Sequence, residues 1–180
     1  MKEKKANRNR FYHELVICNM SDFTFTIQSE IKSDRATVWK HITQLKNVNA
    51  ELLPYARMTY PADRAELGDM DVPMGTTLLV SVILLFCVIP VDLHFLRFDR
   101  IVAGEGFYEN SVTLTHRFWK HNRTLADSDA GVILRDGVTF CPWMPLVGYV
   151  LLPVYKFIFR HRHERLKEYF MCILLILKYL

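Results

Sequence analysis

Sequence patterns that would point to a specific reaction are missing from this chain of 180 residues. It has no G-x-S-x-G turn for a serine nucleophile and no glycine-rich loop for phosphate. No two histidines are spaced as a helical zinc pair would be, because His161 and His163 are two residues apart and diverge on a helix. We therefore expect no metal, no cofactor and no nucleotide chemistry.

The four cysteines are few and widely separated, without a C-x-x-C pair, and no signal peptide is expected ahead of them. Three of them lie inside apolar runs. We interpret all four as reduced, buried core residues of a cytoplasmic protein. They are Cys18, Cys87, Cys141 and Cys172.

Apolar runs of membrane-spanning length are also missing, since a spanning helix needs about 20 residues. Leu78 to Ile89 is rich in valine and isoleucine, which predicts a buried strand. Cys172 to Leu177 closes with Lys178 and predicts a docked helix end in preference to a membrane contact.

Outside the first ten residues, neither positive nor negative charge is in clear excess. The net charge is +4, and five of the 23 basic residues lie in that short stretch. The remainder is nearly neutral, so we expect no nucleic-acid partner. Residues 1 to 20 are predicted to be a basic, partly disordered lead, and residues 21 to 180 a single ligand-binding domain.

What is present is a clear strand followed by helical spacing. Residues 23 to 31 alternate apolar and polar side chains, as in a half-buried strand. Ser33 is a candidate N-cap for a helix of about three turns that carries Trp39 on its apolar face. A second short helix is expected around residues 48 to 53.

Residues 60 to 75 hold prolines and glycines among acidic side chains, which predicts a surface loop that could cover a cavity. An antiparallel meander and a long helix should follow, with Pro153 as a kink or restart. The class is α+β: a curved antiparallel sheet against helices on one face, with a cavity between. The predicted strands cover 76–89, 91–102, 107–112, 116–125 and 132–140, with a turn at 127–131 and the helix at 146–177.

The strongest candidate site lies on the strand that carries Trp119, His121 and Arg123 on one face. If this face looks inward, the three side chains offer stacking and hydrogen bonds to a ligand. The alternative is a solvated face. His116 and Phe118 are expected on the opposite face.

Asp136 lies among apolar neighbours on the next strand and should be paired. A structural ion pair with Arg123 or His121 is favoured over a catalytic carboxylate. On the last helix, Phe159 and His163 share a face and Arg162 runs beside it, so both polar side chains could meet the sheet. The alternative is an ordinary amphipathic helix with its cations in water.

The element order, the Asp34-Arg35-Ala36-Thr37-Val38-Trp39 helix start, the Trp119-x-His121-x-Arg123 strand and the closing Phe159-x-x-Arg162-His163 helix resemble the SRPBCC superfamily. This helix-grip group includes START lipid-transfer domains and polyketide cyclase/dehydrase-like proteins. The resemblance implies a hydrophobic small molecule bound between sheet and helix. The candidate ligand contacts are Trp39, Trp119, His121, Arg123, Asp136, Phe159, Arg162 and His163.

Three functions follow as hypotheses. The first is binding or transport of a lipid, polyketide-like aromatic or isoprenoid. The second is a cyclase/dehydratase-type enzyme with His121 or His163 as general base and Arg123 steadying an oxyanion. The third is docking on membranes or partners through the basic amino terminus and the apolar carboxyl terminus.

Overall fold

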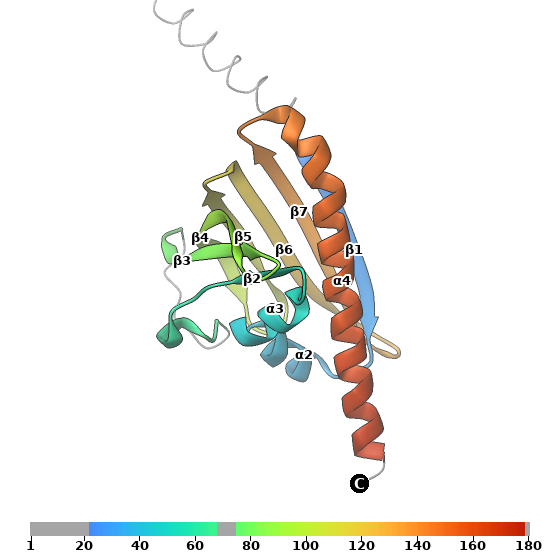
Figure 1. Ribbon diagram of the computed structural model, residues 1–180. Helices are drawn as coiled ribbons and strands as arrows, with labels where there is room; N and C mark the ends of the chain where they lie inside the picture. Colours follow the sequence, from blue (N-terminus) through green and yellow to red (C-terminus); the bar gives the residue numbers. More distant parts are fainter. Residues whose placement is uncertain (1–21, 68–74, 179–180) are drawn as a thin grey trace, which may run out of the picture.

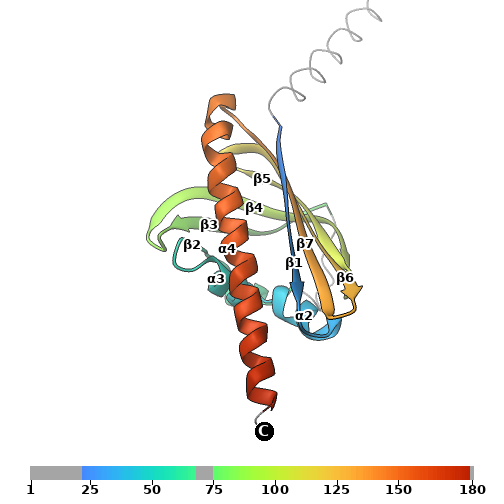
Figure 2. The same cartoon turned by 90° about the vertical axis from the view of Figure 1, so that its right-hand side faces the viewer.

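The sheet at the centre of the molecule has seven antiparallel strands in the order β1-β7-β6-β5-β4-β3-β2. The computed structural model describes residues 22–67 and 75–178. The sheet curves, and the long helix α4 lies along its concave face (Figures 1 and 2). The α+β helix-grip architecture is therefore confirmed. The strands are β1 (Phe23–Ile31), β2 (Ala56–Met58), β3 (Thr77–Leu85), β4 (Ile89–Val102), β5 (Gly106–Thr113), β6 (His116–Ser128) and β7 (Gly131–Pro142).

Strand β1 has the bounds that its alternating pattern predicts. It pairs with β7 over its whole length, from Phe23 opposite Phe140 to Ile31 opposite Val132. Phe25 and Ile31 are buried while Thr24 and Thr26 are exposed, so the period of two separates the core face from the solvent face.

Two short helices follow β1, as predicted, but the first begins with a different cap. The N-cap of α2 (Arg35–Ile42) is Asp34, whose carboxylate accepts from the Thr37 amide at 2.9 Å. Ser33 was the wrong residue, and its own amide donates to Ile31. A carboxylate at this position also favours the partial positive charge of the helix amino end. The second helix, α3 (Leu45–Leu52), begins three residues earlier than expected.

The predicted buried strand at residues 76–89 ends early, and this prediction is wrong for its last residues. Strand β3 stops at Leu85, and a turn with positive φ at Phe86 and Cys87 leads into β4. Phe86 is 59% and Val88 73% exposed. Apolar composition alone did not reveal this turn. Strand β2, which pairs with the end of β3, was missed because three residues are too short to show a period.

The prediction that the cysteines are core residues holds for Cys141 only among those described. Cys87 is partly exposed in the β3–β4 turn, and Cys172 is exposed on α4. Cys18 and the predicted basic lead lie outside the described residues. The loop predicted at 60–75 contains the 3-10 helix η1 (Ala62–Arg64) and is described only as far as Leu67.

Helix α4 (Pro145–Lys178) has 34 residues, a length of about 51 Å, and continues through Pro153 without a restart. Its carboxyl end passes beyond the sheet (Figures 1 and 2). Phe170 is buried, but Leu175 and Ile176 are 53% and 56% exposed, so the docked helix end predicted there is wrong. In the described part of the chain, no helix has both the length and the apolar character needed to cross a membrane.

Candidate functional site

Eight polar side chains meet between the concave face of the sheet and α4, and we call them the buried polar cluster. The six elements that supply them come from different parts of the sequence, which the fold brings together (Figure 1). Most members are less than 10% exposed. They are Glu51 from α3, His94 from β4, Glu109 from β5, His121 and Arg123 from β6, Asp136 from β7, and Arg162 and His163 from α4.

Asp136 is the centre of this cluster and is fully buried. Arg123 donates to it twice, from Nε to Oδ1 and from Nη2 to Oδ2, both at 2.7 Å. His121 Nε2 lies 3.0 Å from Oδ1 and His163 Nε2 lies 3.1 Å from Oδ2. Burial alone would raise the pKa of Asp136, but Arg123 and His121 hold it well below the ordinary value. The carboxylate is therefore ionised and paired, as the sequence predicted.

His121 bridges two carboxylates. With Nε2 on Asp136, its Nδ1 lies 3.5 Å from Oε2 of Glu109. Burial opposes the charged imidazole, but Asp136 and Glu109 outweigh it and raise the pKa of His121. A neutral ring would turn a lone pair toward one of the two carboxylates, whereas the imidazolium donates to both. We conclude that the cationic form fits this position.

Glu109, on β5, faces three hydrogen-bond donors: His94, Ser111 and His121. Its Oε1 lies 2.6 Å from His94 Nε2 and accepts from the Ser111 hydroxyl at 2.7 Å. Burial would raise the pKa of Glu109, but the charges and hydrogen bonds of His94 and His121 lower it to about 2. The sequence analysis missed Glu109 and His94. Strand periodicity carried no clear signal for Glu109, because its neighbours two residues away are Phe107 and the polar Ser111, unlike the apolar neighbours of Asp136.

Glu51 joins the two arginines and was also missed. Its Oε2 accepts from Arg162 Nε at 3.1 Å and Nη2 at 2.9 Å, and from Arg123 Nη1 at 3.5 Å. The guanidinium of Arg162 also lies 5.1 Å from the ring centroid of Phe159. Arg162 and His163 thus face the sheet and do not point into water, which confirms the inward interpretation of α4.

Three buried polar atoms at this site have no hydrogen-bond partner among the described residues. They are Oε1 of Glu51, Nδ1 of His163 and the hydroxyl of Ser81. Ser81 lies on β3, directly opposite His94 of β4. With Nε2 donating to Asp136, a neutral His163 presents Nδ1 as an acceptor. An unpaired buried polar atom costs about 1–3 kcal/mol, so each of these positions favours a further hydrogen-bonding partner.

His116 was expected on the face opposite His121, and this prediction is wrong. A shift of register between His116 and Phe118 interrupts the pairing of β6 with β7. This irregularity turns His116 inward, where it is 1% exposed and its Nε2 lies 3.2 Å from the Tyr155 hydroxyl. Strand periodicity does not reveal such a bulge.

The aromatic candidates are placed in two different regions. Trp119 and Phe159 lie beside the cluster, and the Phe159 ring meets the His121 ring edge-on at 5.1 Å. Trp39 is buried in a separate apolar cluster with Ile31, under the carboxyl half of α4. The structure therefore brings together every predicted site residue except Trp39. Their role in binding a ligand stays a prediction.

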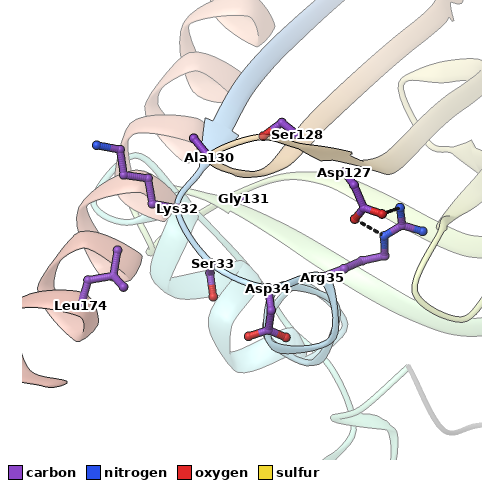
Figure 3. A pocket seen from close by; sticks show the side chains of 9 residues that line it. All are labelled: Lys32, Ser33, Asp34, Arg35, Asp127, Ser128, Ala130, Gly131 and Leu174. Atoms are coloured by element: carbon purple, nitrogen blue, oxygen red, sulfur yellow. Dashed lines mark hydrogen bonds and ion pairs between the residues drawn. The ribbon is translucent and has the colours of Figure 1, made fainter.

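A surface hollow of about 580 Å³ lies apart from the buried polar cluster, beside the β6–β7 turn (Figure 3). It lies where the β6–β7 turn approaches the start of α2 and Leu174 of α4. Arg35 donates from Nε to Asp127 at 2.8 Å across it, so its charge is already paired. Within residues 22–67 and 75–178, no three histidine, cysteine or acidic side chains are grouped to hold a metal ion.

The pH dependence of folding should report the His121 bridge. Because its pKa is raised in the folded protein, its contribution is fully present below the unfolded pKa of about 6.5 and is lost as pH rises through the folded pKa. We expect the free energy of unfolding to fall with rising pH in this window, and His121→Gln to flatten that fall. Denaturant unfolding at a series of pH values measures it.

The control is His161→Gln on α4. The His161 ring hydrogen-bonds the Leu53 carbonyl outside the cluster, so this variant should keep the wild-type slope. An unchanged slope in His121→Gln would contradict the bridge.

At acid pH the dependence of stability on pH has the opposite sign. The lowered pKa values of Asp136 and Glu109 give stability that is present above about pH 4.5 and lost below it.

The comparisons with known proteins define the class first. The chain has the helix-grip fold, which several solved structures share with it at low sequence identity. A Chromobacterium violaceum protein, CV1439, superposes with a TM-score of 0.61 at 14% identity, over 81% of this chain and 95% of that one. A START superfamily protein from Mycobacterium smegmatis gives 0.56 at 6% identity, over 84% and 98%. The di-domain ARO/CYC StfQ from the steffimycin biosynthetic pathway gives 0.60 at 10% identity, over 91% and 59%.

Within this class, the chain belongs to the family described as a domain of unknown function, DUF8410, whose sequence profile matches residues 29–170. The matched range runs from β1 to Phe170 of α4 and includes all members of the buried polar cluster. No curated protein matches the chain in sequence.

Proposed function

We propose that this protein binds a hydrophobic small molecule in the cytoplasm, held between the sheet and α4 with its polar end at the buried polar cluster. The observation that carries the proposal is the set of orphaned polar atoms on Glu51, His163 and Ser81. Two of these atoms are acceptors, so the ligand should carry a hydroxyl or phenol that donates to one of them. A lipid, a polyketide-like aromatic or an isoprenoid alcohol meets this description.

Aromatic side chains near the cluster would contact the apolar body of the ligand. Phe107 and Phe159 both meet the His121 ring edge-on, with centroids 5.3 and 5.1 Å away. Trp119 is half-buried beside Phe159. The helix-grip folds of the START superfamily protein and of the ARO/CYC StfQ support the same placement by analogy of fold.

Native mass spectrometry of protein purified from its own cells, followed by denaturing extraction, tests the proposal. We expect a hydroxylated apolar molecule at near-stoichiometric level. His163→Leu removes the Nδ1 acceptor and should raise the Kd for the extracted molecule by about tenfold, the effect of one hydrogen bond of about 1.4 kcal/mol. His161→Leu, two residues away and outside the cluster, is the matched control. An empty wild-type protein would contradict the proposal.

A cyclase/dehydratase-type enzyme is the second candidate, favoured by the convergence of His121, His163 and Glu109. His163 is the better base, because its Nδ1 is unpartnered whereas both nitrogens of His121 face carboxylates. Arg123 already donates from Nε, Nη1 and Nη2 to two carboxylates, which leaves little of its charge for an oxyanion. Conversion of the extracted molecule by wild type and not by His163→Gln would establish the enzyme.

A further inference from the structure

The amino half of α4 is apolar on its outward side as well as on its inward side. Residues 145–155 contain no charged residue. Toward the sheet they bury Gly148 and partly bury Leu151 and Tyr155. Toward solvent, Leu146 is 80% and Val150 66% exposed. A helix that is apolar all round requires a second apolar contact.

Neighbouring side chains extend this exposed surface, which we call the amino-end apolar patch. The Trp143 amide donates to the Thr115 carbonyl at 3.2 Å and so ties the β5–β6 turn to the start of α4. Leu114 in that turn is 64% exposed. Single exposed apolar residues are ordinary, but a continuous group marks a contact surface. The patch consists of Leu114, Trp143, Met144, Leu146, Tyr149 and Val150.

Strand β1 begins beside the patch. Phe23, its first residue, meets the Tyr149 ring edge-on at 5.0 Å. Both views show β1 and α4 starting at the same end of the molecule (Figures 1 and 2). The start of β1 therefore lies at the patch, and the first ten residues of the sequence include five lysines and arginines.

The charges on the chain segment that carries most of the patch are of one sign, while the nearest carboxylates are those of Asp22 before β1 and of Asp92, which accepts from Thr115. Residues 137–163 contain no aspartate or glutamate, and the same range includes Lys156 and the exposed Arg160. The Arg117 guanidinium lies 5.4 Å from the Trp143 ring centroid at the edge of the patch. An apolar surface that includes a tryptophan and a tyrosine and has Arg117, Lys156 and Arg160 beside it matches an anionic lipid interface.

The other end of α4 does not have this combination. Leu175 and Ile176 are exposed there, but Glu164 and Glu168 lie on the same helix, and the neighbouring hollow includes Asp34 and Asp127. The docking hypothesis from the sequence used the basic amino terminus together with the apolar carboxyl terminus. In the structure, the start of β1 and the carboxyl end of α4 lie at opposite ends (Figure 1).

We propose that the amino-end apolar patch docks on the surface of an anionic lipid bilayer, with Leu146 and Val150 inserted at the interface and the basic amino terminus on the lipid head groups. This inference goes beyond the proposed ligand binding and does not depend on it. The patch supplies apolar burial, and the cations supply attraction that salt screens.

Flotation with vesicles of phosphatidylcholine, with and without about one third phosphatidylserine, tests the docking. We expect the full-length wild type to float with the anionic vesicles, and less so at high salt. Leu146→Glu with Val150→Glu should reduce this binding by about tenfold or more, because two apolar side chains leave the interface and two anions enter. Both residues are exposed, so circular dichroism should show an unchanged fold.

The matched control is Leu175→Glu, an exposed leucine at the other end of the same helix, which should float as the wild type does. Replacing the five basic residues of the first ten by glutamine in the full chain should also cost about tenfold or more on anionic vesicles. Wild-type protein that does not float, or patch variants that float equally well, would overturn the proposal. A patch variant that instead turns a stable dimer into a monomer would also overturn it, since the patch would then bind a second copy.

Discussion

Arg123→Met is expected to lower the free energy of unfolding by about 3–5 kcal/mol, the largest effect of any substitution in the buried polar cluster. Arg123 is fully buried and supplies both short hydrogen bonds to Asp136. Methionine has a similar volume, so the loss comes from the carboxylate that is left without its guanidinium. Chemical denaturation of the purified variant measures the loss.

A double-mutant cycle separates this pairing from simple loss of packing. Arg123→Met with Asp136→Leu removes both charges, and we expect it to be more stable than the sum of the single variants by about 2 kcal/mol or more. This double variant also keeps the test open if Arg123→Met alone does not fold. Arg160→Met, on the exposed side of α4, is the control and should change stability by less than about 0.5 kcal/mol. Additive effects of the two cluster substitutions would contradict the pairing.

Glu51→Ala is expected to cost about 3 kcal/mol, the second largest effect, because Arg162 would lose its carboxylate partner in the interior. Glu51 is 2% exposed and is the member of the cluster that links α3 to α4. The loss should therefore appear in thermal unfolding as well as in denaturant unfolding.

Glu164→Ala is the matched control for Glu51→Ala. Glu164 also accepts from a cation, Lys167 at 2.7 Å, but this pair lies on the solvent side of α4. An exposed pair three residues apart contributes about 0.2–0.5 kcal/mol. If the two glutamates gave equal losses, burial would not be the reason that Glu51 matters.

The order of the elements was predictable because each long element has a clear period. Residues 23–31 alternate with Ser29 as the one exception, and β1 has those bounds. The bounds failed where the backbone departs from a regular element. Phe86 and Cys87 take positive φ in the middle of an apolar run, and the register shift after His116 turns a side chain to the other face. Neither event changes the composition of the sequence around it.

The site was predictable where one strand carries several of its members. Trp119, His121 and Arg123 share a face, and a carboxylate among apolar neighbours identified Asp136 as paired. Glu51 was missed because its partners are far away in sequence: Arg162 is 111 residues later. A glutamate on a short helix looks solvated until a long-range contact is known, although Glu51 follows the half-buried Val48 by one helical turn.

The charges of the buried polar cluster also determine which protonation state of a ligand could enter it. Three carboxylates, those of Glu51, Glu109 and Asp136, are buried with two guanidiniums, those of Arg123 and Arg162. The imidazolium of His121 adds a positive charge that faces two of these carboxylates. A neutral alcohol can enter such an interior without changing this balance. A carboxylic acid would have to carry its own proton inward, and an amine would have to leave one outside, so protonation state selects among ligands of the same size and shape.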